Sequence, residues 1–338
     1  MSDYSIAIRT IGKAGEKYRK LLKSIDESLH RPKKVVVVLP EGYEPPEDQL
    51  GYEEFVYCPK SMIGQRLEAL KYIDTEYTLF LDDDISFSPE FVDKLLEPLE
   101  EDKFDCSTGP LFSFFPASTA GKIAGTLMGA VSVSVFHRDM YVKILRTGGW
   151  SYHTFDTDVK RYYPTESFAW TCFMIRTQCF RDIDMEDEIP WIEKHGYAIG
   201  DDRVMAYKLI KRGYRACIVS NALYDHNDAK TSTSAEEMVN TKPSFCMGFF
   251  HVVFWKRYIQ DLEDGMMKRM INSLCFCYWN IAMRGYHLLK SLNPAHRPFR
   301  RAFNDGVKQG QCYVKTNAYR KLLPVQKNSG ITREGKSI

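Results

Sequence analysis

The sequence TLFLDDDIS at residues 78–86 ends an apolar run with three consecutive acids. The apolar residues predict a buried strand at 77–81, and this strand would bring Asp82, Asp83 and Asp84 to one point. Carboxylates packed together raise one another's pKa unless a positive group lies among them. The triplet therefore predicts either a cation site at the end of a strand or a solvated turn in which Asp83 caps the next segment.

Predicted strands and helices alternate on both sides of this triplet. The predicted strands lie at 5–10, 34–39, 54–59 and 77–81, and the predicted helices lie at 15–29, 63–73 and 87–99. Ser88 is expected to be the N-cap of the last helix, with Pro89 at its first position. This order is typical of an α/β fold with a parallel sheet.

Ligands bind beyond the carboxyl ends of the strands in such sheets. Thr10, Glu41 and the acid triplet follow three of the predicted strands, so we expect them to line one crevice. Asp82 and Asp84 lie on one face of an extended turn. Mg²⁺ and Mn²⁺ prefer carboxylate oxygens, and Mg²⁺ is commonly held by one or two carboxylates plus substrate phosphates.

Two further segments carry candidate site residues. A predicted strand at 170–176 is followed by a predicted helix at 201–212, which begins with Asp201 and Asp202 and has Gly213 just past its end. These acids fit either an N-cap or a general base that faces the cleft. His226 follows the last predicted strand, at 216–220, and fits either a metal ligand or a structural histidine.

The composition is that of a globular protein of about two domains, with 338 residues, 44% of them hydrophobic. Charges interrupt the first twenty residues where a secretory signal needs an apolar segment, and the nine cysteines show no paired spacing. We therefore expect a cytoplasmic protein with reduced thiols.

The C-terminal third is basic. Residues 242–338 contain 17 lysines and arginines against 5 acids, a net charge of +12, whereas the rest of the chain has a net charge of −10. Such a segment favours an anionic partner: lipid head groups, nucleic acid or polyphosphate. Its amphipathic helices are expected either to lie on an anionic membrane or to pack on the α/β domain.

These segments together resemble the family 2 glycosyltransferases. The resemblance covers residues 5–226 and is carried by SIAIRT, VVVVLPEG, the stretch GQRLEALKYIDTEYTLFLDDDISFSPEFVDKLL and the segment GDDRVMAYKLIKRGY. It implies a GT-A, Rossmann-like nucleotide-sugar-binding domain with a mixed, mostly parallel sheet, followed by a basic helical extension. The expected divisions are 1–240 for the transferase domain (1–105 for the nucleotide, 106–240 for the acceptor), 241–324 for the basic helices and 325–338 for a disordered tail.

The resemblance also implies roles for individual residues. Asp84 would ligate the metal, Asp82 would contact the ribose or a metal-bound water, and Asp202 would be the catalytic base. Asp82 and, from its place after the last predicted strand, His226 are the further candidate metal ligands. The residues that would bind the nucleotide-sugar are Thr10, Glu41, Arg66, Asp82 and Asp83. Pro40 stands where the family usually has another acid, which leaves the nucleobase open.

The expected function is an inverting, Mn²⁺- or Mg²⁺-dependent transfer of sugar from a nucleotide-sugar, with a UDP-sugar favoured, to a glycan or lipid-linked glycan. Surface polysaccharide synthesis is the expected context, at the inner face of the cell membrane and without a nucleic-acid partner. The alternatives are a metal-dependent sugar nucleotidyltransferase and a non-catalytic scaffold. A nucleotidyltransferase normally has a glycine-rich phosphate loop, for which IRTIGKAGEK is a poor match.

Overall fold

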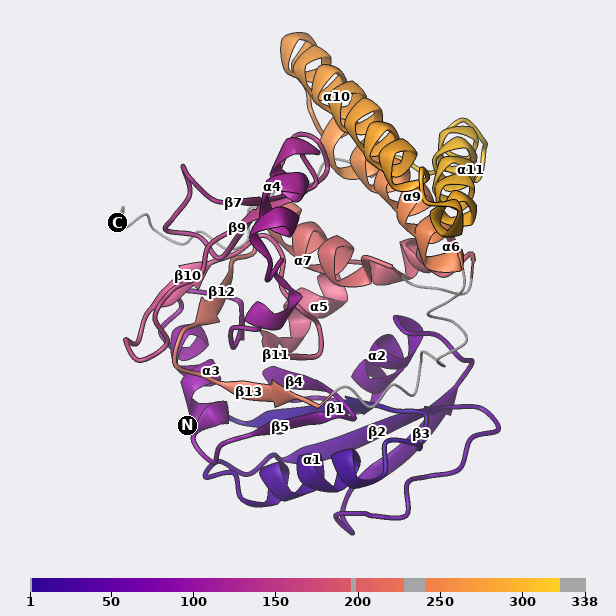
Figure 1. Cartoon of the computed structure of the whole chain (residues 1–338). Helices are drawn as coiled ribbons and strands as arrows, with labels where there is room; N and C mark the ends of the chain where they lie inside the picture. The colour runs from indigo at the N-terminus through magenta and orange to yellow at the C-terminus, as the bar shows by residue number, and fades with distance from the viewer. Residues whose placement is uncertain (1, 196–198, 228–240, 323–338) are drawn as a thin grey trace.

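An eight-stranded sheet forms the centre of the computed structural model, which describes residues 2–195, 199–227 and 241–322 (Figure 1). In spatial order its strands are β10 (Tyr162–Pro164), β12 (Ala216–Val219), β6 (Cys106–Thr108), β11 (Cys172–Arg176), β4 (Tyr77–Asp82), β1 (Tyr4–Arg9), β2 (Lys34–Pro40) and β3 (Glu54–Cys58). Strands β10 and β11 run antiparallel to their neighbours, and the other pairings are parallel. The predicted mixed, mostly parallel α/β sheet is therefore confirmed. Residues 1–105 supply the half of the sheet from β4 to β3.

Helices cover both faces of this sheet because its strands are apolar on both sides. Ile6 and Ile8 of β1 face a cluster with α1 (Glu16–Asp26) and α3 (Phe91–Glu100). Ala7, between them, faces the opposite cluster, which contains residues of three other helices. These helices are α2 (Gly64–Ala69), α5 (Thr177–Asp182) and α7 (Asp201–Lys211).

Smaller elements complete the domain. A two-stranded sheet pairs β5 (Ile85–Phe87) with β13 (Tyr224–His226), and a three-stranded sheet contains β7 (Val131–Val133), β9 (Trp150–Tyr152) and β8 (Val142–Ile144). The remaining helices of this part are α4 (Thr119–Leu127), α6 (Ile189–Ile192) and the 3₁₀ turns Leu70–Tyr72, Phe112–Phe114 and Met185–Asp187. Pairing of β5 with β13 holds the turn after the acid triplet against a distant part of the chain.

The structure corrects the predicted start of α3 and the predicted cap of α7, while α7 itself begins at Asp201 as predicted. Ser88 and Pro89 precede α3 as a turn, in which the Ser88 carbonyl accepts a hydrogen bond from the Phe91 amide, and Glu90 occupies the cap position. Gly200 precedes α7, so Asp201 and Asp202 are its first helical residues and not its cap. A glycine with φ of +80° makes this entry possible, since few other residues adopt that conformation.

The C-terminal helices are α9 (Lys242–Phe254), a π-helical turn (Trp255–Gln260), α10 (Met266–Lys290), a 3₁₀ turn (Pro294–His296) and α11 (Arg297–Tyr313). Helix α9 contributes Phe249 and Phe254 to the domain core, and α11 packs on α9. The contact is close because a Cβ at Gly306 would meet the Phe245 carbonyl oxygen at 2.0 Å. Packing on the catalytic domain, one of the two expected arrangements, therefore holds for α9.

The helices of the basic C-terminal third were also predicted to contact a membrane. Among the described helices, none is long and apolar enough to cross a bilayer. In Figure 1, α10 extends away from the sheet, above α4 and α7. The predicted domain boundary at residue 240 and the predicted disordered tail at 325–338 lie outside the described residues.

Candidate active site

The carboxyl ends of β1, β2 and β4 lie at one edge of the sheet. In the strand register Arg9 pairs with Val38 of β2 on one side and with Asp82 of β4 on the other. Thr10, Glu41 and the acid triplet, which follow these strand ends, therefore share this edge as predicted. All three acids of the triplet are less than 10% exposed, so the alternative of a solvated turn is wrong.

Two guanidinium groups hold Asp82. Arg9 donates from Nη2 to Asp82 Oδ2 at 2.8 Å and from Nε to Oδ1 at 3.1 Å, while Arg66 Nη2 donates to Oδ1 at 3.1 Å. Burial lowers the pKa of Arg9, but the Asp82 and Asp201 carboxylates outweigh burial and raise it. Burial, followed by repulsion from Arg9, lowers the pKa of Arg66. These three bonds use about three of the four lone-pair sites of the carboxylate, which leaves one site on Oδ2 for a cation.

Asp83 faces the end of β1. Thr10 Oγ1 donates to Asp83 Oδ2 at 2.6 Å, and the same hydroxyl accepts from the Gly12 amide at 2.9 Å. Burial raises the pKa of Asp83 to about 6; the Thr10 hydrogen bond opposes this rise, and the Asp82 and Asp84 carboxylates reinforce it. Asp83 therefore fixes the loop after β1 beside the triplet.

Asp84 lies against β13. Its Oδ1 is 3.5 Å from His226 Nε2, and its carbonyl accepts from the Asn227 amide at 2.9 Å and from Asn227 Nδ2 at 3.0 Å. The pairing of Ile85 with His226 in the β5–β13 sheet creates this contact. The sequence therefore contains the imidazole and the carboxylate more than a hundred positions apart, and the fold joins them.

The residues present fit a divalent cation that is shared with a substrate. Within 2–195, 199–227 and 241–322, no three His, Cys, Asp or Glu side chains converge to hold a metal alone. Mg²⁺ commonly takes only one or two carboxylates from the protein and its other ligands from phosphates and water. Asp84 and His226 supply a carboxylate oxygen and an imidazole nitrogen 3.5 Å apart at the sheet edge.

The acids at the start of α7 lie close to Arg66 and, through it, to Asp82 of the acid triplet. Asp201 Oδ2 is 3.9 Å from Arg66 Nη1, so Arg66 lies between the acid triplet and α7. Asp201 is buried, whereas Asp202 is partly exposed. Burial raises the pKa of Asp202 well above its usual range, and the Asp201 carboxylate adds to this effect while Arg66 opposes it. A carboxylate with a raised pKa suits a general base.

The structure thus joins most of the predicted site residues through contacts. Thr10, Arg66 and the triplet are connected directly or through one partner, and Glu41 is exposed just beyond the end of β2. Sequence reasoning missed Arg9. Its signal in the sequence was an arginine at the end of a buried strand, as the acid triplet stands at the end of another.

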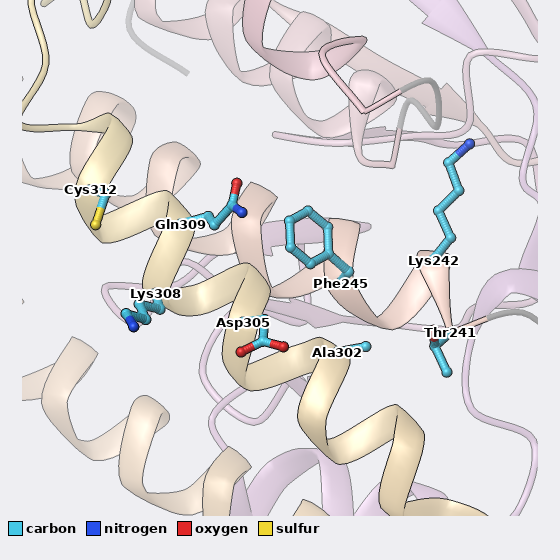
Figure 2. A pocket seen from close by; sticks show the side chains of 8 residues that line it. All are labelled: Thr241, Lys242, Phe245, Ala302, Asp305, Lys308, Gln309 and Cys312. Atoms are coloured by element: carbon cyan, nitrogen blue, oxygen red, sulfur yellow. The ribbon is translucent and has the colours of Figure 1, made fainter.

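The described residues also line a cavity of about 550 Å³ between α9 and α11 (Figure 2). Its lining combines Lys242, Lys308 and Asp305 with the ring of Phe245. None of the predicted site residues lines it. The candidate active site is therefore defined by the sheet edge and α7, not by this cavity.

Residues 56–184 match the family model "Glycosyl transferase family 2". The chain carries a glycosyltransferase domain. The matched segment includes Arg66 and the acid triplet, whereas Thr10 and Asp202 lie outside it. The predicted enzyme class is confirmed for this domain, and the assignment of individual residues stays a prediction.

Comparison with solved structures confirms the GT-A fold of the glycosyltransferase domain. The chain is similar to GalNAc-T7, solved with UDP, GalNAc and Mn²⁺, with a TM-score of 0.51 and 10% identity over 82% of this chain and 56% of that one. It also matches residues 1–349 of TarS from S. aureus, with a TM-score of 0.43 and 14% identity over 92% of each chain. No curated protein sequence matches the chain. Because the match to GalNAc-T7 covers 56% of that structure, the chain spans little more than half of its length.

Proposed function

We propose that the protein transfers a sugar from a nucleoside-diphosphate sugar to a hydroxyl group of a glycan or lipid-linked glycan, with inversion at the anomeric carbon. The observation that carries this proposal is the meeting of Asp84 and His226 beside the Asp82–Arg9–Arg66 cluster, at the carboxyl edge of a sheet in a glycosyltransferase domain. A UDP-sugar is the favoured donor. The presence of UDP and Mn²⁺ in the GalNAc-T7 structure supports this choice.

The nucleotide would lie across the ends of β1, β2 and β4, with Thr10 and Glu41 on its path. Asp84 and His226 would hold the cation, Mn²⁺ or Mg²⁺. When bound, this ion offsets the negative charge of the leaving diphosphate as a Lewis acid. Arg9 and Arg66 hold the Asp82 carboxylate in place through hydrogen bonds, and thereby position the turn that carries Asp84.

Asp202 would take the proton from the acceptor hydroxyl as this hydroxyl attacks the anomeric carbon. Its partial exposure at the start of α7 allows contact with an acceptor. Asp201 would act through Arg66, which it approaches at 3.9 Å. One displacement without a covalent intermediate inverts the configuration. Synthesis of surface polysaccharide or another glycoconjugate, in the cytoplasm and at the inner face of the membrane, is the context we propose.

Turnover of a donor panel in Mn²⁺ tests this function. We expect release of nucleoside diphosphate from one or a few nucleotide-sugars, slowly with water and faster with a glycan acceptor. Release of inorganic diphosphate from a nucleoside triphosphate and a sugar phosphate would instead identify the nucleotidyltransferase alternative. A protein that binds donors without turning any of them over would be the scaffold.

The metal assignment predicts a loss of nucleotide affinity in Asp84→Asn. An amide is a weaker cation ligand than a carboxylate, so most of the affinity for nucleoside diphosphate in Mn²⁺ should disappear while the fold stays intact. Isothermal titration calorimetry measures this affinity, and Asp225→Asn is the matched control, since Asp225 is an exposed acid on the same strand as His226. Equal affinity in Asp84→Asn and the parent would refute the assignment.

A further inference from the structure

Helix α10 has two apolar faces, and only one of them packs against the protein. The packed face contains Trp279, Met283 and the partly buried Phe276. Trp279 stacks on His251 of α9 with ring centroids 3.5 Å apart, and it also contacts Phe303 of α11. This face accounts for the position of α10 on α9 and α11.

The opposite face is apolar along the whole helix. Its exposed residues recur at intervals of three, four or seven positions, as on one side of an α-helix. They include Met267, Met270, Leu274, Ile281, Leu288 and, just beyond the helix, Leu292. Leu274 is 63% exposed, Ile281 67% and Leu292 76%. A helix of 25 residues is about 37 Å long, so this apolar face is larger than the scattered exposed residues of an ordinary surface.

The apolar face continues onto α4. The Tyr278 hydroxyl donates to the Leu127 carbonyl at the end of α4, so the two helices touch at this point. Leu127 is 65% exposed and Ile123, one turn earlier on α4, is 56% exposed. Exposed apolar side chains of α4 therefore lie close to the point where α10 meets that helix.

The exposed cations of α10 favour an anionic partner for its apolar face. The helix contains Lys268, Arg269, Arg284 and Lys290 and no acid, and all four cations are exposed. Lys268 pairs with Glu263, just before the helix, at 3.5 Å. A second copy docked through this face would still bring together two helices that each carry three other cations, which costs free energy at low salt. Anionic lipid head groups would instead neutralise these charges while the acyl chains receive the apolar side chains.

We propose that the exposed face of α10, extended by Ile123 and Leu127 of α4, docks in the interface of an anionic lipid bilayer. The helix lies in the plane of the membrane surface, with its apolar side chains below the head groups and its lysines and arginines among them. Because α9 and α10 are packed on the glycosyltransferase domain, docking holds that domain at the surface. This inference goes beyond the proposed transfer reaction and does not depend on it.

Sedimentation of the full chain with vesicles tests the proposal. We expect the protein to pellet with vesicles of phosphatidylcholine and anionic phosphatidylglycerol at low salt, and to be released as salt screens the charges. Leu274→Glu/Ile281→Glu should bind at least roughly ten-fold more weakly, because two apolar anchors are lost and two like charges meet the lipid. Arg284→Gln/Lys290→Gln should reduce the preference for anionic over neutral vesicles.

Leu29→Glu is the matched control, since Leu29 is 68% exposed and lies beyond the end of α1, outside this face. It should pellet like the parent, and the circular dichroism spectra of all variants should coincide. A parent protein that stays in the supernatant with anionic vesicles at low salt would overturn the proposal. Equal binding of Leu274→Glu/Ile281→Glu and the parent to these vesicles would overturn it as well. If this variant abolished a dimer seen by analytical ultracentrifugation without changing vesicle binding, the face would be a dimer interface and the proposal would be wrong.

Discussion

Asp202→Asn is expected to lower turnover by roughly 10² or more, the usual contribution of general-base catalysis. An amide keeps the size of the carboxylate but cannot accept the acceptor's proton. Donor affinity should persist, because the nucleotide would be held at the ends of β1, β2 and β4. The decisive measurement is turnover with donor and acceptor both saturating.

The pH dependence of turnover gives a second measure of Asp202. Burial and the Asp201 carboxylate raise the pKa of Asp202, so its ionised, basic form is reached only at higher pH than for an ordinary aspartate. Turnover of the parent should therefore rise with pH through this raised pKa.

The raised pKa of Asp202 also affects stability. A carboxyl whose pKa is higher in the folded than in the unfolded protein stabilises the fold below its unfolded-state pKa and loses that contribution as pH rises through its folded-state pKa. At neutral pH Asp202→Asn should thus be as stable as the parent or more stable.

Asp201→Asn is the matched comparison for Asp202→Asn. Both acids lie in the first turn of α7, but Asp201 is buried and faces Arg66, whereas Asp202 is partly exposed. We expect Asp201→Asn to reduce turnover less. If Asp202→Asn retained near-parental turnover, the base would be another residue.

Glu188→Ala is expected to destabilise the protein by about 3–5 kcal/mol, the usual cost of leaving buried charges without their partner. Glu188 is fully buried and accepts from Lys208 Nζ at 2.8 Å and from Arg257 Nη2 at 2.7 Å. Lys208 belongs to α7 and Arg257 to the π-helical turn after α9. The carboxylate therefore joins the helix of the proposed base to the C-terminal helices. Urea unfolding measures the loss.

Glu186→Ala is the control for Glu188→Ala, because Glu186 lies in the preceding 3₁₀ turn and is exposed. Its free energy of unfolding should change by less than about 0.5 kcal/mol.

The contribution of Glu188 to stability should depend on pH. Burial raises the pKa of Glu188, but Lys208 and Arg257 outweigh burial and lower it. Glu188 thus stabilises the fold above its unfolded pKa, and the difference between parent and Glu188→Ala should shrink as pH falls through its folded pKa. Equal stabilities at neutral pH would contradict the role of this network.

Much of the sheet could be predicted from local sequence patterns. The four strands before residue 82 were predicted to within two residues at their ends, because apolar runs bounded by polar loops report burial directly. The helical spacing of Val204, Met205 and Leu209 predicts the inward face of α7, and all three residues are fully buried. Helix starts were less predictable. Ser88 and Pro89 are residues that favour the cap and first position of a helix, but α3 begins only at Phe91, whose side chain packs in the core.

The sequence by itself determined the alternating α/β elements, the acids at the strand ends and the basic C-terminal third, since each of these is a property of neighbouring residues. Only the tertiary structure decided the partners. Strand register places Arg9 against Asp82, the pairing of β5 with β13 places His226 against Asp84, and packing of α10 leaves one apolar face exposed. Contacts between residues far apart in the chain depend on which strands pair and which helix faces are covered, and no local pattern contains that information.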